Sequence, residues 1–131
     1  METTILYNAT ADDASGQTVC ELKYLIEMMG AKKSLIKGIM DAFLVQIPEE
    51  LFNINNAVAK SDYVIIKNLA HSMKSSLSIM GVSASEPLLV EMEFLGGEGS
   101  EIGKIRALNT TLNTLCTRAI EEIEKAKHDY E

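Results

Sequence analysis

A single apolar stripe that runs for more than 20 residues constrains the fold of this chain more than any other feature. Its members are spaced three or four positions apart: Ile36, Met40, Phe43, Ile47, Leu51, Ile54 and Val58. Such spacing keeps side chains on one face of an α-helix, whereas a strand alternates every second residue. Pro48 lies inside the stripe, where a proline removes one helical hydrogen bond and costs about 3 kcal/mol. Because the phase is the same on both sides of Pro48, the pattern predicts one long, kinked helix rather than two.

Helix-start signals predict a helix on either side of this long one. Thr18 and Glu21 have the spacing of a capping box, and the short helix that they open should end at Gly30. The dipeptide Ser61-Asp62 supplies an N-cap for the helix after the long one. The predicted buried stripe of that later helix consists of Ile65, Leu69, Met73, Leu77 and Met80.

Two more helices complete the pattern. Residues 83–86 (Ser-Ala-Ser-Glu) form a second capping box, and Pro87 falls in the first turn, where a missing N–H matters least. Residues 96–99 (Gly-Gly-Glu-Gly) then predict a loop, and the last helix begins near Ser100. Its apolar stripe consists of Ile105, Leu108, Leu112, Leu115, Ala119 and Ile123. No segment has the alternating, β-branched pattern of a strand.

Five helices joined by short connections predict an all-α fold. Short connections make successive helices antiparallel, which favours an up-down four-helix bundle with the short N-terminal helix packed on one end. The chain has 131 residues, the size of one domain. We assign residues 1–17 to a flexible lead-in, 18–127 to the bundle and 128–131 to a polar tail. Only 5% of the residues are aromatic and none is Trp, so the core must be aliphatic.

Charge and cysteine content argue against several classes of protein. Nineteen acidic and twelve basic side chains give a net charge of −7, which disfavours binding to nucleic acid or to an anionic membrane surface. Cys20 and Cys116 are too far apart for a zinc site or a disulfide framework, so we expect no metal site and a reducing, cytoplasmic compartment. No signal peptide and no bilayer-spanning apolar run is evident. We expect a monomer, because no broad apolar stripe is left once the bundle closes.

One polar helix face suits phosphate chemistry. Lys67, His71, Lys74, Ser75 and Ser78 lie at helical spacing on one side, which predicts a solvent-facing His71 between two lysines with no acidic residue nearby. A neutral imidazole is a nucleophile near pH 7, and ammonium groups stabilise phosphoryl charge. The small serines would let a partner approach the ring. A surface histidine is, however, more often only a solvated side chain.

The residues around His71 favour the functional interpretation, whereas His128 in the charged tail is assigned no role. Ala70, His71, Lys74 and Ser76, with Met73 in place of Leu and Gly81 ten residues after the histidine, match A-H-x-L-K-G-[SA]. This string resembles the signature of histidine-containing phosphotransfer (HPt) domains. Ser75 stands where the family usually has Gly, but it is still small. Phe43 and the pair Met92-Glu93 also lie where that family has similar residues, and the resemblance covers about residues 18–127.

The resemblance implies a covalent phosphoryl carrier in a phosphorelay. One nitrogen of His71, usually Nε2, would attack the aspartyl phosphate of a response-regulator receiver domain and later pass the phosphoryl group to another receiver. Lys74, with Lys67 as a second candidate, would stabilise the transferred charge, and Ser75 and Ser78 would line the access face. A hybrid sensor histidine kinase is a further possible partner.

The same resemblance implies no cofactor of the chain's own. Mg²⁺ and its acidic ligands would belong to the partner receiver, and the chain has no nucleotide motif for autophosphorylation with ATP. The alternative is a helical interaction module that binds a receiver or kinase domain without carrying phosphate. A haem- or ligand-binding bundle would instead require His71 to be buried.

Overall fold

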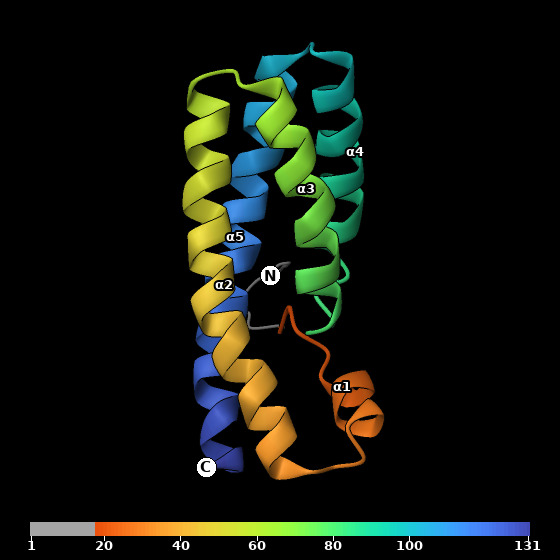
Figure 1. The fold of residues 1–131 in the computed structure, drawn as a ribbon, viewed down its shortest axis with the longest axis vertical. Helices are drawn as coiled ribbons and strands as arrows, with labels where there is room; N and C mark the ends of the chain where they lie inside the picture. The colour runs from red at the N-terminus through yellow and green to blue at the C-terminus, as the bar shows by residue number, and fades with distance from the viewer. Residues whose placement is uncertain (1–17) are drawn as a thin grey trace, which may run out of the picture.

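The computed structural model describes residues 18–131, so the predicted lead-in at residues 1–17 lies outside the described part of the chain. The described residues form only helices and turns, which confirms the all-α prediction. The elements are α1 (Lys23–Met28), α2 (Lys33–Ala59), α3 (Tyr63–Ser78), α4 (Ser85–Glu98), α5 (Ile102–Ala126) and the 3₁₀ turn η1 (Lys127–Tyr130). From α2 to α5, each helix runs opposite to the one before it (Figure 1).

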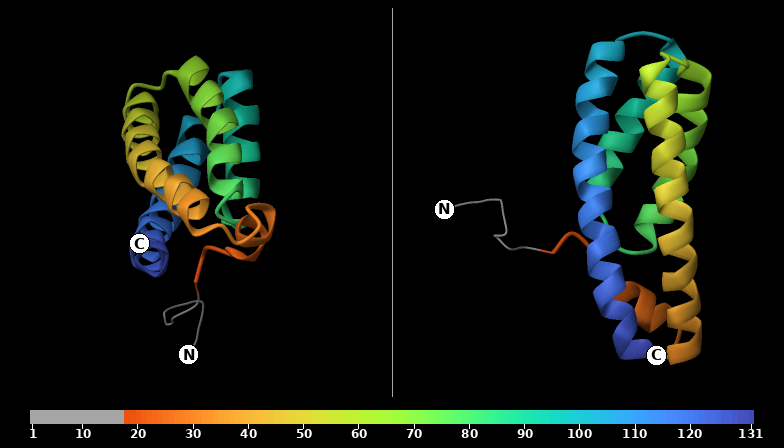
Figure 2. Two further views of the ribbon diagram at one scale, coloured as in Figure 1. Left: turned by 60° about the horizontal axis from the view of Figure 1, so that its bottom comes forward. Right: turned by 90° about the vertical axis from the view of Figure 1, so that its left-hand side faces the viewer.

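The four long helices close into a bundle. Helix α3 packs against α2 and α4, and α5 packs against the same two helices from the other side. Both α2 and α5 are longer than α3 and α4, and they extend beyond them at one end of the bundle (Figures 1 and 2). Helix α1 and the turn η1 lie at this extended end, and the α1 residue Leu25 is fully buried there.

Helix α2 is continuous through Pro48, as the unbroken phase of its stripe predicts. Figure 1 shows its N-terminal half leaning away from the direction of its C-terminal half. Pro48 itself is exposed, so the backbone group that lacks a hydrogen bond lies toward solvent. Every residue of the predicted stripe is buried except Leu51, which is half-buried.

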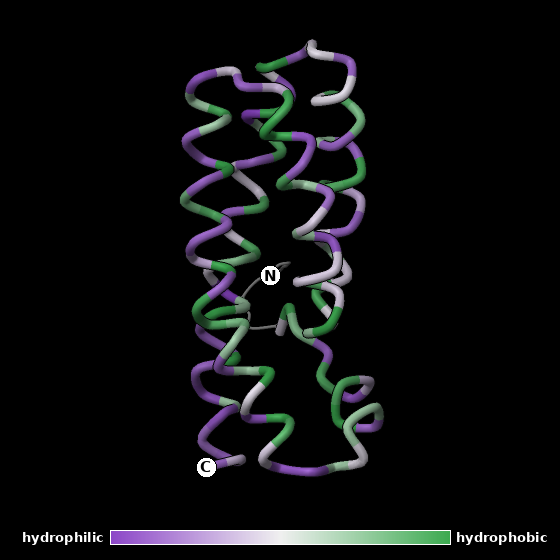
Figure 3. Tube along the Cα trace, in the orientation of Figure 1, coloured by the Kyte–Doolittle hydropathy of each residue, from purple (hydrophilic) through white to green (hydrophobic). Residues whose placement is uncertain are grey.

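The core is aliphatic, and Phe43 is the one aromatic side chain buried among residues 18–131. Apolar and polar residues alternate along each helix at helical spacing (Figure 3). The predicted stripe of α3 is wrong in its first half. Ile65 is 42% exposed, whereas Ile66 and Ala70 are fully buried together with Met73 and Leu77. Ala70 is small but lies on the buried face of α3. A stripe chosen from the larger apolar residues therefore falls one position before the residues that are buried.

Neither predicted capping box forms. Helix α1 begins at Lys23, and its N-cap residue Leu22 makes no side-chain cap. The backbone N–H groups of Val19 and Cys20 donate to the carboxylate of Glu122 on α5, at 2.8 and 2.9 Å, and the Glu21 carboxylate accepts from the N–H of Lys23, at 3.0 Å. Helix α4 also lacks a side-chain cap, because its N-cap residue is Ala84. Ser85 is buried, and its hydroxyl donates to the carbonyl of Val82 at 2.7 Å. A tertiary partner, Glu122, therefore holds the backbone before α1, whereas the contact of Ser85 at the start of α4 is local. The N-cap at Asp62 is confirmed, because its carboxylate accepts from the N–H of Ile65.

The loop predicted at residues 96–99 is also wrong, because α4 continues through Glu98. Only Gly99 leaves the helix, with the left-handed φ of +67° that a C-terminal glycine tolerates. Gly96 is buried inside the helix, against the backbone of α3. Glycine is here a packing residue rather than a helix breaker, a distinction that residue type alone does not make.

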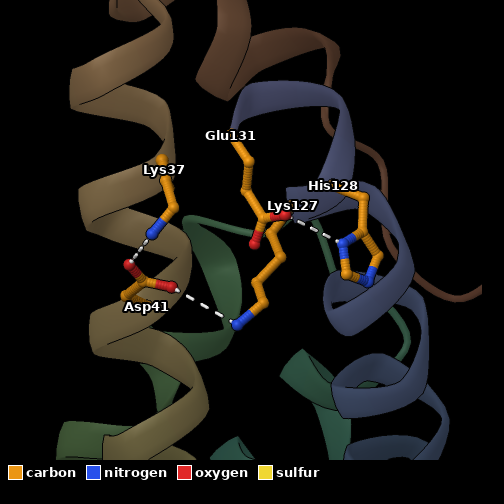
Figure 4. A network of polar contacts seen from close by, with 5 residues as sticks. All are labelled: Lys37, Asp41, Lys127, His128 and Glu131. Atoms are coloured by element: carbon orange, nitrogen blue, oxygen red, sulfur yellow. Dashed lines mark hydrogen bonds and ion pairs between the residues drawn. The ribbon is translucent and has the colours of Figure 1, made fainter.

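One ion pair, between Lys127 and Asp41, joins the C-terminal turn to α2 (Figure 4). The carboxylate of Asp41 lies 2.7 Å from the ammonium group of Lys37 on its own helix and 3.8 Å from that of Lys127 in η1. Nδ1 of His128 lies 3.1 Å from Oε1 of Glu131, the residue that follows η1, and the His128 side chain is 68% exposed. These contacts occur at the end of the bundle where η1 packs on α2 and α5, and they give His128 a local partner.

Candidate functional site

The candidate site is the outer face of α3. The helix buries Ala70 and Met73 completely, which turns the intervening His71 outward. The His71 side chain is 70% exposed, so the prediction that it faces solvent is confirmed. A buried haem ligand is incompatible with this exposure. Lys67 lies one turn before His71 on the same face, and it is exposed as well.

Glu93 of α4 reaches across to this face and joins two of its residues. Its Oε2 lies 2.9 Å from Nδ1 of His71, and its Oε1 lies 2.7 Å from Nζ of Lys74. The expectation that no acidic residue lies nearby is therefore wrong. That expectation considers α3 alone, whereas the carboxylate comes from the neighbouring helix. The pair Met92-Glu93 is the signal in the sequence, but nothing in it specifies this contact.

The charge on Glu93 determines which ring nitrogen of His71 is accessible as a nucleophile. The ammonium group of Lys74 and, to a lesser degree, the ring of His71 hold the pKa of the Glu93 carboxyl below its usual value, against the opposing effect of partial burial. An ionised carboxylate only accepts hydrogen bonds, so Nδ1 of His71 must carry the proton. In the neutral ring, Nε2 then has the lone pair. No hydrogen bond to Nε2 is found within residues 18–131.

The two lysines have different surroundings. The side chain of Lys74 is 28% exposed and its ammonium group is held by Glu93. Lys67 has no ion-pair partner among residues 18–131, so its ammonium group is available to an incoming anion. Both lysines thus lie on the face of His71, but the ammonium group of Lys74 is paired with the carboxylate of Glu93.

A groove of about 360 Å³ between α2 and α3 begins one turn after His71. Its lining consists of Gly38, Ile39, Ala42, Phe43, Gln46, Ser75, Ser76 and Ile79. Gln46 crosses it, with Nε2 donating to the hydroxyl of Ser76 at 2.9 Å. Ser78 lies elsewhere, in a separate hollow beside the turn that joins α3 and α4. The two serines predicted to form one access face therefore line different hollows.

The two cysteines lie away from this face. Cys20 precedes α1 and is half-buried, whereas Cys116 lies within α5 and is buried. Burial, with a smaller contribution from Glu50, raises the pKa of Cys116 to about 12. Residues 18–131 contain no cluster of three or more acidic, cysteine or histidine side chains that could bind a metal ion. None of the helices described is both long and apolar enough to cross a bilayer.

Comparisons with known proteins give one family and one solved structure of similar fold. A family profile described as Hpt domain matches residues 38–126, which is more than half of the chain. Among solved structures, the fold is similar to that of histidine-containing phosphotransfer protein B (HptB) from Pseudomonas aeruginosa PAO1. That similarity has a TM-score of 0.79 at 18% sequence identity, and it covers 88% of this chain and 100% of that one. No curated protein sequence matches this chain.

Proposed function

Because the chain belongs to the Hpt domain family and so acts in phosphorelay signalling by histidine phosphotransfer, we propose that His71 is its phosphoacceptor. The observation that carries this proposal is the exposed ring of His71, with Nδ1 held by Glu93 and Nε2 open to solvent. In the proposed reaction, Nε2 attacks the phosphorus of an aspartyl phosphate on a receiver domain. A nitrogen–phosphorus bond forms, the bond to the aspartyl oxygen breaks, and the receiver recovers its carboxylate.

The charged groups around the ring support this chemistry. As Nε2 becomes bonded to phosphorus, positive charge develops on the imidazole, and the carboxylate of Glu93 at 2.9 Å from Nδ1 stabilises that charge. Lys74 and Lys67 supply positive charge to the transferred phosphoryl oxygens. We propose that the chain contributes no cofactor and no autokinase activity, and that Mg²⁺ is bound by the receiver. Catalysis then depends mainly on the relative position of the two reacting groups.

We propose receiver domains, including that of a hybrid sensor histidine kinase, as the partners, with the chain acting as a cytoplasmic monomer that binds neither nucleic acid nor membrane. The groove beside His71 supports a protein partner, because it is lined largely by apolar side chains and opens next to Ser75. Ser75 occupies the position one turn after the ring, where a larger side chain would obstruct approach.

The decisive experiment compares two histidine variants in phosphotransfer from a labelled receiver. His71→Gln should accept no label, whereas His128→Gln should accept label as the wild type does, because His128 is equally exposed but lies on η1. The label should be acid-labile and stable to base, as expected for phosphohistidine. Label on His71→Gln would sink the proposal. Binding to receivers without label on the wild type would favour the alternative, an interaction module that carries no phosphate.

A further inference from the structure

Gly96 lies at a close contact between the backbones of the two helices that bear the site. A Cβ atom placed on Gly96 would lie 2.9 Å from the backbone N of Lys67, 3.0 Å from the carbonyl oxygen of Tyr63 and 3.1 Å from Cα of Lys67. All three atoms belong to the backbone of α3, so no side chain can rotate to make room. Any residue larger than glycine at position 96 therefore requires the two helices to separate.

The neighbouring Gly97 shows that this restriction is specific. A Cβ atom on Gly97 would meet only Cδ of the Lys67 side chain, at the ordinary contact distance of 3.8 Å. Gly97 is exposed, whereas Gly96 is buried. Both residues lie within α4, and alanine favours a helix over glycine at either position. The chain thus contains a matched pair of glycines, of which only one sets the distance between α3 and α4.

The close contact adjoins the polar contacts of the site along both helices. Lys67 is one turn before His71 on α3, and Gly96 is one turn after Glu93 on α4. Glu93 uses both of its oxygens at short range, 2.9 Å to His71 and 2.7 Å to Lys74. Because both oxygens are engaged, rotating the carboxylate cannot compensate for a displaced helix without lengthening one of the two contacts.

We infer that Gly96 is a positioning residue for phosphotransfer, because it sets the helix spacing at which Glu93 holds the ring of His71 in the Nδ1–H tautomer. The inference rests on the proposed function of His71. The reactivity of Nε2 then depends on the backbone contact of Gly96, which lies one turn away from the reacting atoms. Without the contact to Glu93, the neutral ring redistributes its proton toward Nε2 and loses the nucleophilic lone pair there.

The test compares Gly96→Ala with Gly97→Ala by two measurements. The first is the fraction of His71 in the Nδ1–H tautomer, read from imidazole ¹⁵N chemical shifts at about pH 8.5, where histidine is ordinarily neutral. The second is the rate of phosphotransfer from a labelled receiver. Gly96→Ala should lower the fraction of the Nδ1–H tautomer and slow transfer by about tenfold. This is the effect expected from the loss of one charge-assisted hydrogen bond, that between His71 and Glu93. Gly97→Ala should match the wild type in both, and circular dichroism should show equal helical content.

A double variant separates a positioning role from a general loss of stability. In a Glu93→Gln background, Gly96→Ala should slow transfer no further, because both changes act through the same contact. Additive losses would contradict the inference, as would wild-type tautomer and rate in Gly96→Ala. If Gly96→Ala loses helical content, Glu93→Asp takes its place, because it shortens the side chain and leaves the contact between the helices unchanged. Glu93→Asp must then give the same decrease in the Nδ1–H tautomer fraction and the same decrease in transfer rate. The tautomer measurement needs no phosphate, so its outcome is independent of whether His71 proves to be the phosphoacceptor.

Discussion

The Nδ1 atom of His71 lies 2.9 Å from Oε2 of Glu93, a contact made between two helices rather than along one. It gives the two nitrogens of an exposed ring different surroundings, since one faces a carboxylate and the other faces solvent. We expect this asymmetry to be measurable both as a rate and as a contribution to stability.

Glu93→Gln should slow phosphotransfer by about tenfold, because a neutral amide replaces the charge-assisted hydrogen bond that would stabilise the ring in the proposed phosphorylation of Nε2. Single-turnover transfer from a labelled receiver measures the change. Glu91→Gln is the matched control. Glu91 lies two residues earlier on α4 and pairs with Lys104 of α5, at 2.9 Å, rather than with α3. Equal rates for the two variants would remove Glu93 from the mechanism.

Acid should weaken the link between α3 and α4. The pKa of Glu93 is held below its usual value of 4.5, chiefly by Lys74, so its contacts contribute stability above that value. The contribution is lost as pH falls through the lower value of the folded state. Urea unfolding of the wild type and Glu93→Gln should therefore differ at neutral pH and converge in acid. A difference in unfolding free energy that stays constant down to about pH 3 would contradict this assignment.

The two lysines should respond differently to replacement by alanine. Lys74→Ala removes the principal partner of Glu93, so it should slow transfer by about tenfold and raise the pKa of Glu93 toward its usual value. Lys67→Ala should slow transfer by roughly two- to fivefold and leave the pKa of Glu93 unchanged, because an exposed ammonium group acts through weaker, screened interactions. Transfer rates and carboxyl ¹³C titration distinguish the two. Identical titration curves for Glu93 in both variants would refute the distinction.

Periodicity in the sequence predicts the helices and the faces that they expose, but it does not predict the contacts between helices. The stripe of α2 continues in phase across Pro48, and it correctly predicts one helix. The loop prediction at residues 96–99 is wrong because Gly96 is needed for packing against Lys67, a neighbour that no local pattern specifies. In the site, the helix face alone predicts the outward position of His71, whereas the role of Glu93 depends on how α4 lies beside α3.

A cluster of amide side chains between α2 and α5 should matter for stability rather than for transfer. Oδ1 of Asn55 accepts hydrogen bonds from Nδ2 of Asn109, at 2.8 Å, and from Nδ2 of Asn113, at 2.9 Å. Asn55→Ala deprives both donors of this acceptor in a region where Asn109 is only 8% exposed. We expect a loss of about 2 kcal/mol in unfolding free energy, measured with urea.

The control for this change is Asn56→Ala, at an exposed position on the same helix. It should stay within about 0.5 kcal/mol of the wild type. Both variants should transfer phosphate at the wild-type rate, since the cluster lies between α2 and α5 rather than on the face of His71. A stability loss in Asn55→Ala no larger than in Asn56→Ala would show that the amide cluster contributes nothing.

Only one nitrogen of the exposed His71 ring is open to a receiver, because Glu93 occupies Nδ1 and leaves Nε2 facing solvent. In the proposed relay, two receivers therefore cannot hold the ring at the same time. The donor has to depart before the recipient docks, so the lifetime of each complex limits the flow of phosphate. A receiver in excess would delay every other receiver that uses the same histidine, even without accepting phosphate itself. Competition between receivers thus follows from the position of His71 on α3.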